Sequence, residues 1–284
     1  MSFDAPRPRK SFTPAFSASR AADFKQCPLK FRLRTVDKIP EPPSLAALKG
    51  TLVHAVLEKM FTLPAAQREA GQVLLLLPES WVELREKNLA HPDSPLGKDF
   101  NEDTFIDEAK DLLRSYFEIE NPQHLNPAQT ELMVEAQTDY GLNLRGIIDR
   151  IEVAPDGRIR VVDYKSGKAP HPNYTQDALF QMRFYALLLW RAKNTLPARM
   201  QLLYLKDRKV LTFDPQAQDI ESFGTQLQTL WQEVENCANT GVFRPRRSRL
   251  CDWCYFQAQC PLFGGQTPEA PVDGMSRLKA MRTT

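Results

Sequence analysis

A carboxylate and a lysine stand two residues apart in the segment Asp163-Tyr164-Lys165. Side chains alternate between the two faces of an extended strand, so Asp163 and Lys165 are expected on the same face. Such a pair could hold a divalent cation through the carboxylate while the ammonium group neutralises a phosphate or orients an attacking water. The competing interpretation is a partly exposed salt bridge at a strand end, because an Asp-x-Lys triplet alone is common.

A predicted β-hairpin places a second carboxylate beside this pair. Segments 144–153 and 158–165 have the character of strands, and Pro155-Asp156-Gly157 between them is a turn signal. A three-residue loop would set Ala154 opposite Arg158 and, in the same antiparallel register, Asp149 opposite Asp163. A loop of two or four residues would break this facing pair.

The alternation of side chains also predicts what surrounds the two carboxylates. Asp149 and Asp163 fall on a mainly aliphatic face with Ile147, Ile151, Val153, Ile159 and Val161, whereas Arg150, Glu152, Arg158 and Arg160 fall on the other face. Like charges across a ladder are destabilising, and an unpaired buried carboxylate costs on the order of several kcal/mol. A divalent cation would offset both penalties, and hard oxygen ligands suit magnesium or manganese.

Two predicted helices supply further candidate residues. His54 follows Gly50 by four residues and precedes Glu58 by four, so His54 and Glu58 are expected on one helix face. Gln181 and Tyr185 have the same spacing in a segment that follows the lysine strand, where they could hold a phosphate or a base. A lone histidine or tyrosine on a helix is more often a core or surface residue, so these assignments depend on the other candidates.

Cysteine spacing is the second strong signal. Cys251, Cys254 and Cys260 form a C-x2-C-x5-C pattern, and Cys27 stands far upstream as a fourth candidate ligand. Zinc is the usual partner of a C-x-x-C pair. An iron-sulfur cluster held by four thiolates competes with zinc, because the segment has neither a second such pair nor a nearby histidine. Cys237 is interpreted as a small buried apolar residue.

Composition bounds the class of protein. With 284 residues, 42% hydrophobic and 25% charged, the chain has ordinary globular composition, and its net charge of +2 does not by itself argue for a polyanionic partner. Basic residues do cluster locally, in 7–10, 30–34 and 244–249. The apolar run Val73 to Leu77 is too short to span a bilayer, and the N-terminus lacks the apolar stretch of a signal peptide. These features predict a cytoplasmic protein without a membrane partner.

The order of predicted elements favours an α/β (α+β) fold with a mixed sheet. Residues 1–16 are expected to be a flexible basic arm, and residues 264–284 a flexible tail. Helices are expected at 20–34 with Ser17 or Ser19 as the cap, and at 44–63, 67–89, 103–120, 174–193 and 216–239. Strands are expected at 131–140, 144–153, 158–165, 199–205 and 209–213, the first two joined through Gly141-Leu142-Asn143. The first three strands would form a meander that follows a helical section, so we expect a mixed core with a helical insertion at about 64–128.

Five sequence elements together resemble the RecB-family nucleases of the PD-(D/E)XK superfamily. They are Gly50-x-x-x-His54, Gly146-Ile147-Ile148-Asp149, Asp163-Tyr164-Lys165-Ser166-Gly167, Gln181-x-x-x-Tyr185, and Cys27 with Cys251, Cys254 and Cys260. The resemblance extends from about Cys27 to Cys260 and is strongest to the iron-sulfur branch, which includes the CRISPR-associated adaptation nucleases and the nuclease domain of AddB. It implies one restriction-endonuclease-like domain over 17–263, with a mixed central sheet flanked by helices and a C-terminal cysteine cluster.

The resemblance also implies a role for each matching residue. His54, Asp149, Asp163 and the Tyr164 carbonyl would bind magnesium or manganese, and Lys165 would be the catalytic lysine alongside Asp149 and Asp163. Gln181 and Tyr185 would contact substrate DNA. Cys27, Cys251, Cys254 and Cys260 would hold a structural 4Fe-4S cluster, with zinc as the lesser alternative. Any helicase partner would be a separate protein, because no P-loop motif is present.

These expectations predict a metal-dependent DNA exonuclease that acts on single-stranded ends in DNA repair or recombination. The alternative is a non-catalytic nucleic-acid-binding module whose cysteines hold structural zinc. A cluster-dependent redox enzyme is a weaker third interpretation, because the sequence has no glycine-rich nucleotide-binding loop.

Overall fold

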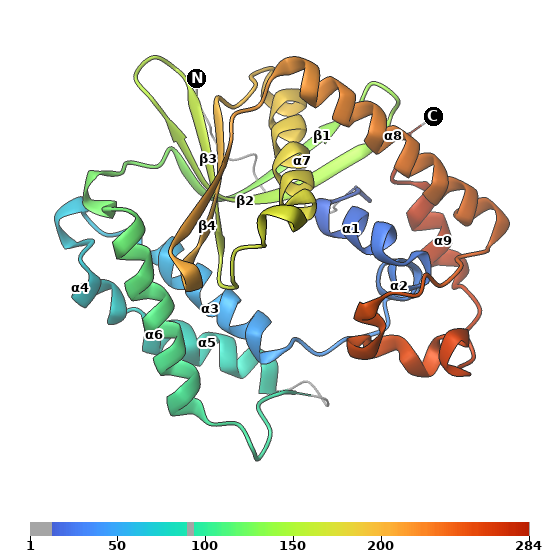
Figure 1. The fold of residues 1–284 in the computed structure, drawn as a ribbon, viewed down its shortest axis with the longest axis horizontal. Coiled ribbons are helices and arrows are strands. Elements are labelled where there is room, and N and C mark those ends of the chain that lie inside the picture. Colours follow the sequence, from blue (N-terminus) through green and yellow to red (C-terminus); the bar gives the residue numbers. More distant parts are fainter. Residues whose placement is uncertain (1–12, 90–93, 284) are drawn as a thin grey trace.

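A five-stranded mixed sheet forms the centre of the computed structural model, which describes residues 13–89 and 94–283 (Figure 1). The strands are β1 (Gln129–Gln137), β2 (Asn143–Val153), β3 (Ile159–Lys165), β4 (Arg199–Tyr204) and β5 (Lys209–Phe213), hydrogen-bonded in that order. Neighbouring strands are antiparallel except β3 and β4, which are parallel. The helix α7 (Gln176–Lys193) makes the crossover between those two strands. The prediction of a mixed α/β core is confirmed.

The β2–β3 hairpin has the predicted register. The backbone N–H of Ala154 donates to the carbonyl oxygen of Arg158 at 2.9 Å, and Gly157 has φ +84, so the loop is Pro155-Asp156-Gly157. Arg150 pairs with Val162, and continuing this register by one step sets Asp149 opposite Asp163.

Helices pack on one face of the sheet, and the larger hydrophobic core lies between them and the strands. The covering helices are α7, α8 (Ala217–Thr240), α1 (Ala18–Gln26) and α9 (Val272–Lys279). Fully buried members of this core include Phe16, Ile151, Phe184 and Trp231. Burial of this much apolar surface is the main driving force for keeping these helices on the sheet.

The predicted helical insertion covers part of the opposite face. It is preceded by α3 (Leu45–Met60) and comprises α4 (Ala70–Leu74), α5 (Leu77–Leu89) and α6 (Glu102–Ile119). The side chains of Ser44 and Asn101 cap α3 and α6 by accepting backbone N–H groups. Leu52, Trp81 and Leu113 pack in a second core that includes Tyr164 of β3.

Two predictions about the faces of β2 are wrong. Ile147 was expected to share the buried face but is 45% exposed, whereas its neighbour Ile148 is buried. In the facing strand, Glu131 has φ +46, and this left-handed residue interrupts the regular β1–β2 ladder. Arg150 was expected on a polar outer face but is fully buried, because the helical insertion covers it.

The N-terminal region begins as predicted and then departs from one continuous helix. Ser17 caps α1, accepting the N–H of Arg20. Pro28 separates α1 from α2 (Pro28–Phe31), because proline has no N–H to continue the bonding pattern of α1. α2 then runs directly into a π-helical turn (Arg32–Val36). Residues 1–12 of the expected flexible arm lie outside the described residues. Phe16 is fully buried and bridges to Leu144, so the arm prediction is wrong at its inner end.

The expectation of a flexible tail over 264–284 is also wrong for the part of the tail that the structure describes. Leu278 of α9 and Met281 are buried, and the N–H of Asn143 donates to the carbonyl oxygen of Met281 at 2.8 Å. Leu142 forms a β-bridge with Arg282. The C-terminal segment is ordered because it packs on the β1–β2 turn and on α8. Its own apolar pattern is too short to indicate these contacts.

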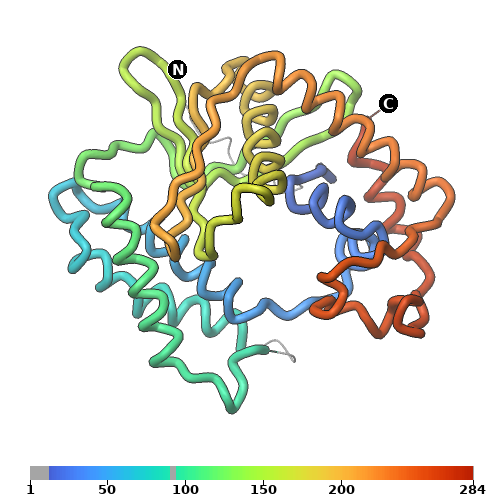
Figure 2. Tube along the Cα trace, viewed as in Figure 1, coloured from blue at the N-terminus to red at the C-terminus, as the bar shows by residue number. Residues whose placement is uncertain are grey.

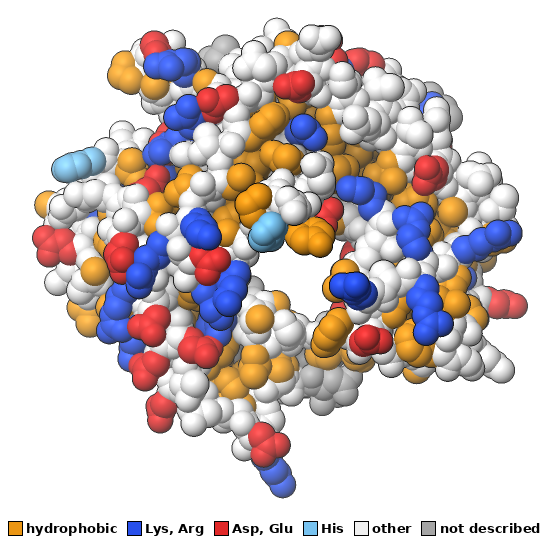
Figure 3. Space-filling view, viewed as in Figure 1, with side chains coloured by type: hydrophobic (Ala, Val, Ile, Leu, Met, Phe, Trp, Pro, Cys, Tyr) orange, Lys and Arg blue, Asp and Glu red, His pale blue; other side chains and the backbone are white. Residues whose placement is uncertain are grey.

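The molecule surrounds an opening. Figure 1 shows α3 and the insertion on the left and the N-terminal helices with the C-terminal segment on the right. Figure 2 shows the link from Asp37 to Ser44 passing below the opening between these two parts. The opening persists when side chains are drawn (Figure 3). No helix in the described part of the chain is long and apolar enough to cross a bilayer.

Candidate active site

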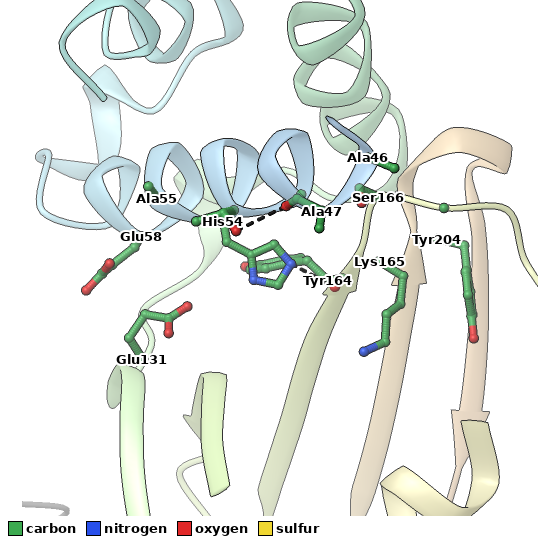
Figure 4. A pocket seen from close by; sticks show the side chains of 13 residues that line it. Ala46, Ala47, His54, Ala55, Glu58, Glu131, Tyr164, Lys165, Ser166 and Tyr204 are labelled. Atoms are coloured by element: carbon green, nitrogen blue, oxygen red, sulfur yellow. Dashed lines mark hydrogen bonds between the residues drawn. The ribbon is translucent and has the colours of Figure 1, made fainter. Parts of the chain in front are cut away.

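A cavity of about 620 Å³ lies between α3 and the end of β3 (Figure 4). Its polar lining residues are Thr51, His54, Glu58, Glu131, Tyr164, Lys165, Ser166 and Tyr204. The residues Gly50, His54 and Glu58 share one face of α3, as predicted from their spacing. Gly50 permits a close approach, because a Cβ there would lie 2.9 Å from Oγ of Ser166. α3 can therefore bring His54 over the strand that carries Lys165.

Asp149 and His54 are joined through the backbone of Tyr164. Oδ2 of Asp149 accepts the backbone N–H of Tyr164 at 2.7 Å and lies 3.4 Å from Nδ1 of His54. Nε2 of His54 lies 2.9 Å from the Tyr164 carbonyl oxygen. Burial alone would lower the pKa of His54, but hydrogen bonding and attraction to Asp149 raise it overall. The structure thus brings three of the predicted metal-binding groups together.

Asp163 and Lys165 contact one another on the same face of β3. Nζ of Lys165 lies 2.6 Å from Oδ2 of Asp163, and Nε2 of Gln181 donates to Oδ1 at 2.9 Å. Burial and the negative charge of Asp149 raise the pKa of Asp163 to about 6, although Lys165 opposes the rise. Asp163 and Lys165 therefore do form the salt bridge of the competing interpretation. The carboxylate of Asp163, however, is buried beside that of Asp149, which a simple surface salt bridge would not require.

Glu131 is a site residue that the sequence analysis missed. Ligand atoms of His54, Glu131 and Asp149 all lie within 4.8 Å of one another, the one such group of three found among the described residues. Burial and, after it, the negative charge of Asp149 together raise the pKa of Glu131 to about 7. Asp163 stands outside this close group. The only earlier signal was the position of Glu131 at the start of a predicted strand.

The donor set of this group fits a divalent cation. Two carboxylates and an imidazole suit manganese well, and the oxygen donors also suit magnesium. Burial and, after it, the negative charge of Asp149 raise the pKa of both Glu131 and Asp163, and a bound cation would offset both effects. His54, Glu131 and Asp149 could hold the cation, with Asp163 and the Tyr164 carbonyl as adjoining oxygen donors.

Gln181 and Tyr185 line a second cavity, of about 820 Å³, which shares Lys165 and Tyr204 with the first. Tyr185 packs under β2, because a Cβ added at Gly146 would lie 2.5 Å from its Cε1 atom. Burial raises the pKa of Tyr185, so its hydroxyl stays protonated. The two cavities adjoin at Lys165 and Tyr204, and we refer to them together as the groove.

Arg150 supports the site from behind. Its fully buried guanidinium donates to the hydroxyl of Tyr164 at 2.8 Å and to Glu120 at 2.6 Å, and it also bonds Tyr116. These contacts join β2, β3 and α6. They hold Tyr164, whose backbone bonds both Asp149 and His54.

The four predicted cysteines come from opposite ends of the chain and meet beside α2. Cys27, Cys254 and Cys260 pack against a small core that contains Phe256. The N–H of Arg246 donates to Sγ of Cys27 at 3.4 Å, and the N–H of Ser248 donates to Sγ of Cys251 at 3.3 Å. Burial raises the pKa of the Cys254 thiol, and the nearby sulfurs of Cys27 and Cys251 also raise it. Cys237 lies apart on α8, partly buried against the main core.

A mixed sheet with buried acids and a lysine at its strand ends, beside three side chains that could hold a metal ion, is the arrangement expected of a metal-dependent phosphodiester hydrolase. The chain belongs to the PD-(D/E)XK nuclease superfamily, whose sequence model matches residues 15–261. The protein is therefore a hydrolytic nuclease of α/β fold. Its superfamily uses divalent metals and acts on DNA.

Individual relatives are distant. The chain is 23% identical over 275 residues to the gene 69 protein of Mycobacterium phage D29, covering 88% of this chain and 97% of the phage protein. It is 21% identical over 309 residues to the gene 69 protein of Mycobacterium phage L5, covering 89% and 98%. A protein of Eubacterium rectale, provisionally named as an exonuclease, has a similar fold with TM-score 0.55, 12% identity, and coverage of 85% and 87%.

Proposed function

We propose that this protein is a metal-dependent DNA exonuclease that acts on single-stranded ends in DNA repair or recombination, with a structural iron-sulfur cluster. The observation that carries the proposal is the close group of His54, Glu131 and Asp149 beside the Asp163–Lys165 pair. The provisional exonuclease name of the Eubacterium rectale protein agrees with it.

Each side chain of the site has a different role in phosphodiester hydrolysis. A bound divalent cation would polarise the scissile phosphate and supply a nucleophile at neutral pH. Lys165 stabilises the negative charge that develops on the phosphate, since its side chain lines both cavities of the groove. Gln181 holds Asp163 by its hydrogen bond, so that Asp163 faces both Lys165 and the cation site. Tyr185 remains a neutral hydrogen-bond donor toward substrate.

The ring shape supports a preference for free single-stranded ends. The cavity with His54 is lined by residues of α3, which borders the opening in Figure 1. The covalent link from Asp37 to Ser44 passes below that opening (Figure 2). A strand that passes through a ring closed by its own chain must enter by an end, so a circular strand would be a poor substrate.

The spacing of the cysteine sulfurs supports a 4Fe-4S cluster over zinc. A tetrahedral zinc site with Zn–S bonds of about 2.3 Å would bring its sulfurs to about 3.8 Å from one another. Within residues 13–89 and 94–283, no three cysteine sulfurs approach within 4.8 Å. A cuboidal cluster keeps its four thiolates farther apart, and N–H groups directed at the sulfurs are typical of its surroundings.

The nuclease proposal is tested with linear and circular single-stranded DNA in manganese. Wild-type protein should degrade the linear DNA and leave the circle intact. Asp163→Asn and Lys165→Ala should each lose at least about a hundredfold in rate, because each removes charge from the reacting centre. Lys209→Ala, which changes an exposed lysine of β5 that lines neither cavity, is the control. Full activity of Lys165→Ala would refute the assigned site, and equal cleavage of the circle would refute exonuclease action.

The cluster is tested on protein purified without oxygen. We expect about four irons per chain and a brown protein, and Cys260→Ser should lose most of the iron. Cys237→Ser is the matched control and should keep it. A colourless wild-type protein with one zinc would support the alternative of a zinc-bound module, and absence of metal-dependent cleavage would then make that module non-catalytic.

A further inference from the structure

The cysteine-bearing segment presents an unusual set of exposed aromatic and aliphatic side chains. Trp253 is 79% exposed, although it lies between the ligand candidates Cys251 and Cys254. Leu250 and Phe263 in the same segment are also exposed, at 54% and 45%. Phe256 alone turns inward, where it is buried against α2. The segment's own core therefore does not use Trp253, and its indole faces solvent.

Three exposed arginines lie close to Trp253 in the sequence. Arg244, Arg247 and Arg249 are exposed, and none forms an ion pair with a carboxylate of the described chain. Asp252 is the only acidic residue between 241 and 264. Figure 3 shows basic side chains gathered over this part of the molecule, with apolar side chains between them. We call this surface, made by Arg244, Arg247, Arg249 and Trp253, the arginine–tryptophan surface.

The combination of an exposed indole with unpaired arginines fits single-stranded nucleic acid. Unpaired nucleobases stack on exposed aromatic side chains, while arginines contact the phosphates of the same strand. A duplex hides its base faces and could use only the arginines. A protein partner with an acidic surface would be attracted by the arginines but would not require a stacking ring.

The surface belongs to a segment that borders the opening (Figure 1). In Figure 1 the C-terminal segment borders the opening on the side opposite α3, the helix that carries His54. A strand held in the groove at Lys165 and continuing through the opening would meet this segment. The surface is separate from the groove, because neither groove cavity is lined by residues beyond 204.

We propose that the arginine–tryptophan surface binds single-stranded nucleic acid outside the catalytic groove, with one base stacked on Trp253. This inference rests on the proposed function only in taking DNA as the substrate. Binding at the surface itself needs no catalytic metal. It would retain a strand between successive cleavage events, so its loss should affect long substrates more than short ones.

The decisive experiment is equilibrium binding of fluorescein-labelled dT20 to full-length protein in EDTA, measured by anisotropy. Trp253→Ala should raise Kd about tenfold or more, and Trp253→Phe should bind nearly as well as wild type because a stacking face remains. Arg247→Ala with Arg249→Ala should raise Kd and reduce the slope of log K against log salt by about 1.4, because each phosphate contact with a single strand releases about 0.7 of an ion. Val272→Ala, which alters an equally exposed side chain on α9, is the control.

A second readout separates stacking from loss of folding. Trp81 and Trp231 are buried and Trp190 is half-buried, so Trp253 is the most exposed of the four indoles. Binding of dT20 should quench tryptophan emission in wild type, and Trp253→Phe should bind dT20 without that quenching. Iron content and melting temperature should match wild type in both Trp253 variants.

Other outcomes would overturn the inference. If Trp253→Ala binds dT20 like wild type, or loses equal affinity for a 20-base-pair duplex, the surface does not stack bases. The first result would leave a protein partner as the occupant of the surface. Failure of the nuclease proposal is recognised separately, because it would abolish cleavage of thymidine 5′-p-nitrophenyl phosphate by wild type without changing the binding results.

Discussion

Glu131 lies directly across the β1–β2 ladder from Asp149, between the paired positions Thr130 with Arg150 and Leu132 with Ile148. At this position Glu131 has φ +46, a conformation that costs a residue with a side chain of the order of 1 kcal/mol or more. The strained backbone directs a third acidic group toward His54, as Figure 4 shows. The irregularity in the ladder thus lies at the metal group itself.

Replacing Glu131 by Gln should weaken metal binding. The change keeps the size of the side chain but removes one of the two carboxylates in the three-residue group, so we expect the manganese Kd to rise roughly 10- to 100-fold. Isothermal titration with manganese measures this directly, and the metal dependence of cleavage should shift equally. Glu135→Gln, an exposed change on the same strand, is the control. An unchanged manganese affinity would remove Glu131 from the ligand set.

Without metal, the protein should become less stable as the pH rises. Burial and the negative charge of Asp149 raise the pKa of Glu131 to about 7 and that of Asp163 to about 6, and the pKa of His54 is also raised. The folded protein therefore holds protons more tightly than the unfolded chain. This stabilisation is complete below about pH 4, the unfolded carboxyl pKa, and is lost as the pH rises to about 7.

Thermal melts in EDTA test this pH dependence. The melting temperature should be higher at about pH 5.5 than at about pH 8, and Glu131→Gln should reduce the difference. Saturating manganese should reverse the trend at the higher pH, because protons compete with the metal for the same ligands. A melting temperature in EDTA that rises between these two pH values would contradict the raised pKa values.

Arg150→Met should be strongly destabilising. It leaves Glu120 and Glu152 with the partly exposed Arg160 as their cationic partner and removes the buried hydrogen bonds to Tyr116 and Tyr164. We therefore expect a loss of about 3 kcal/mol in the free energy of unfolding. Urea denaturation measures the loss.

The control for Arg150 is Arg158→Met, in the turn of the same hairpin, where the arginine side chain is 74% exposed. This change should alter stability by no more than about 0.5 kcal/mol. A similar small effect from Arg150→Met would show that the buried network does not join the insertion to the sheet.

Gly146→Ala should disturb the approach of α7 to β2. The added Cβ would lie 2.5 Å from Cε1 of Tyr185 and 3.0 Å from Cδ2 of Leu188. Overpacking of this kind costs about 1–3 kcal/mol, and displacement of Tyr185 should also lower the cleavage rate. Gly71→Ala in α4, where nothing lies within 4 Å of the new Cβ, should be neutral or stabilising by up to about 1 kcal/mol. Unchanged cleavage by Gly146→Ala would show that the packing of α7 on β2 does not affect catalysis.

Local sequence signals were sufficient for most elements and for part of the site. The turn Pro155-Asp156-Gly157 set the β2–β3 register, since the loop length decides which residues face each other. The facing pair of Asp149 and Asp163 followed from it. The amphipathic pattern likewise predicted α7, and the capping preference of serine predicted the start of α1.

Glu131 could not be found in the same way, because its position depends on a turn whose length the sequence does not fix. A loop at Gly141-Leu142-Asn143 would set Glu131 opposite Val153. The turn instead closes between Thr138 and Leu142, whose backbone and side chain bond each other, and this shifts Glu131 to Asp149. A change of loop length moves every pair in the hairpin.

The sequence by itself determined the order of helices and strands, the Asp163–Lys165 pair on one face and the superfamily, because these depend on local periodicity, turn chemistry and residue spacing. Tertiary structure decided which surfaces were covered and which distant groups met. Apolar periodicity does not report which element packs on a face, so the burial of Arg150, the folding of α9 and the exposure of Ile147 were not foreseen. Glu131 and His54 join Asp149 in the site only because β1 and α3 pack beside β2, and local sequence patterns do not predict that packing.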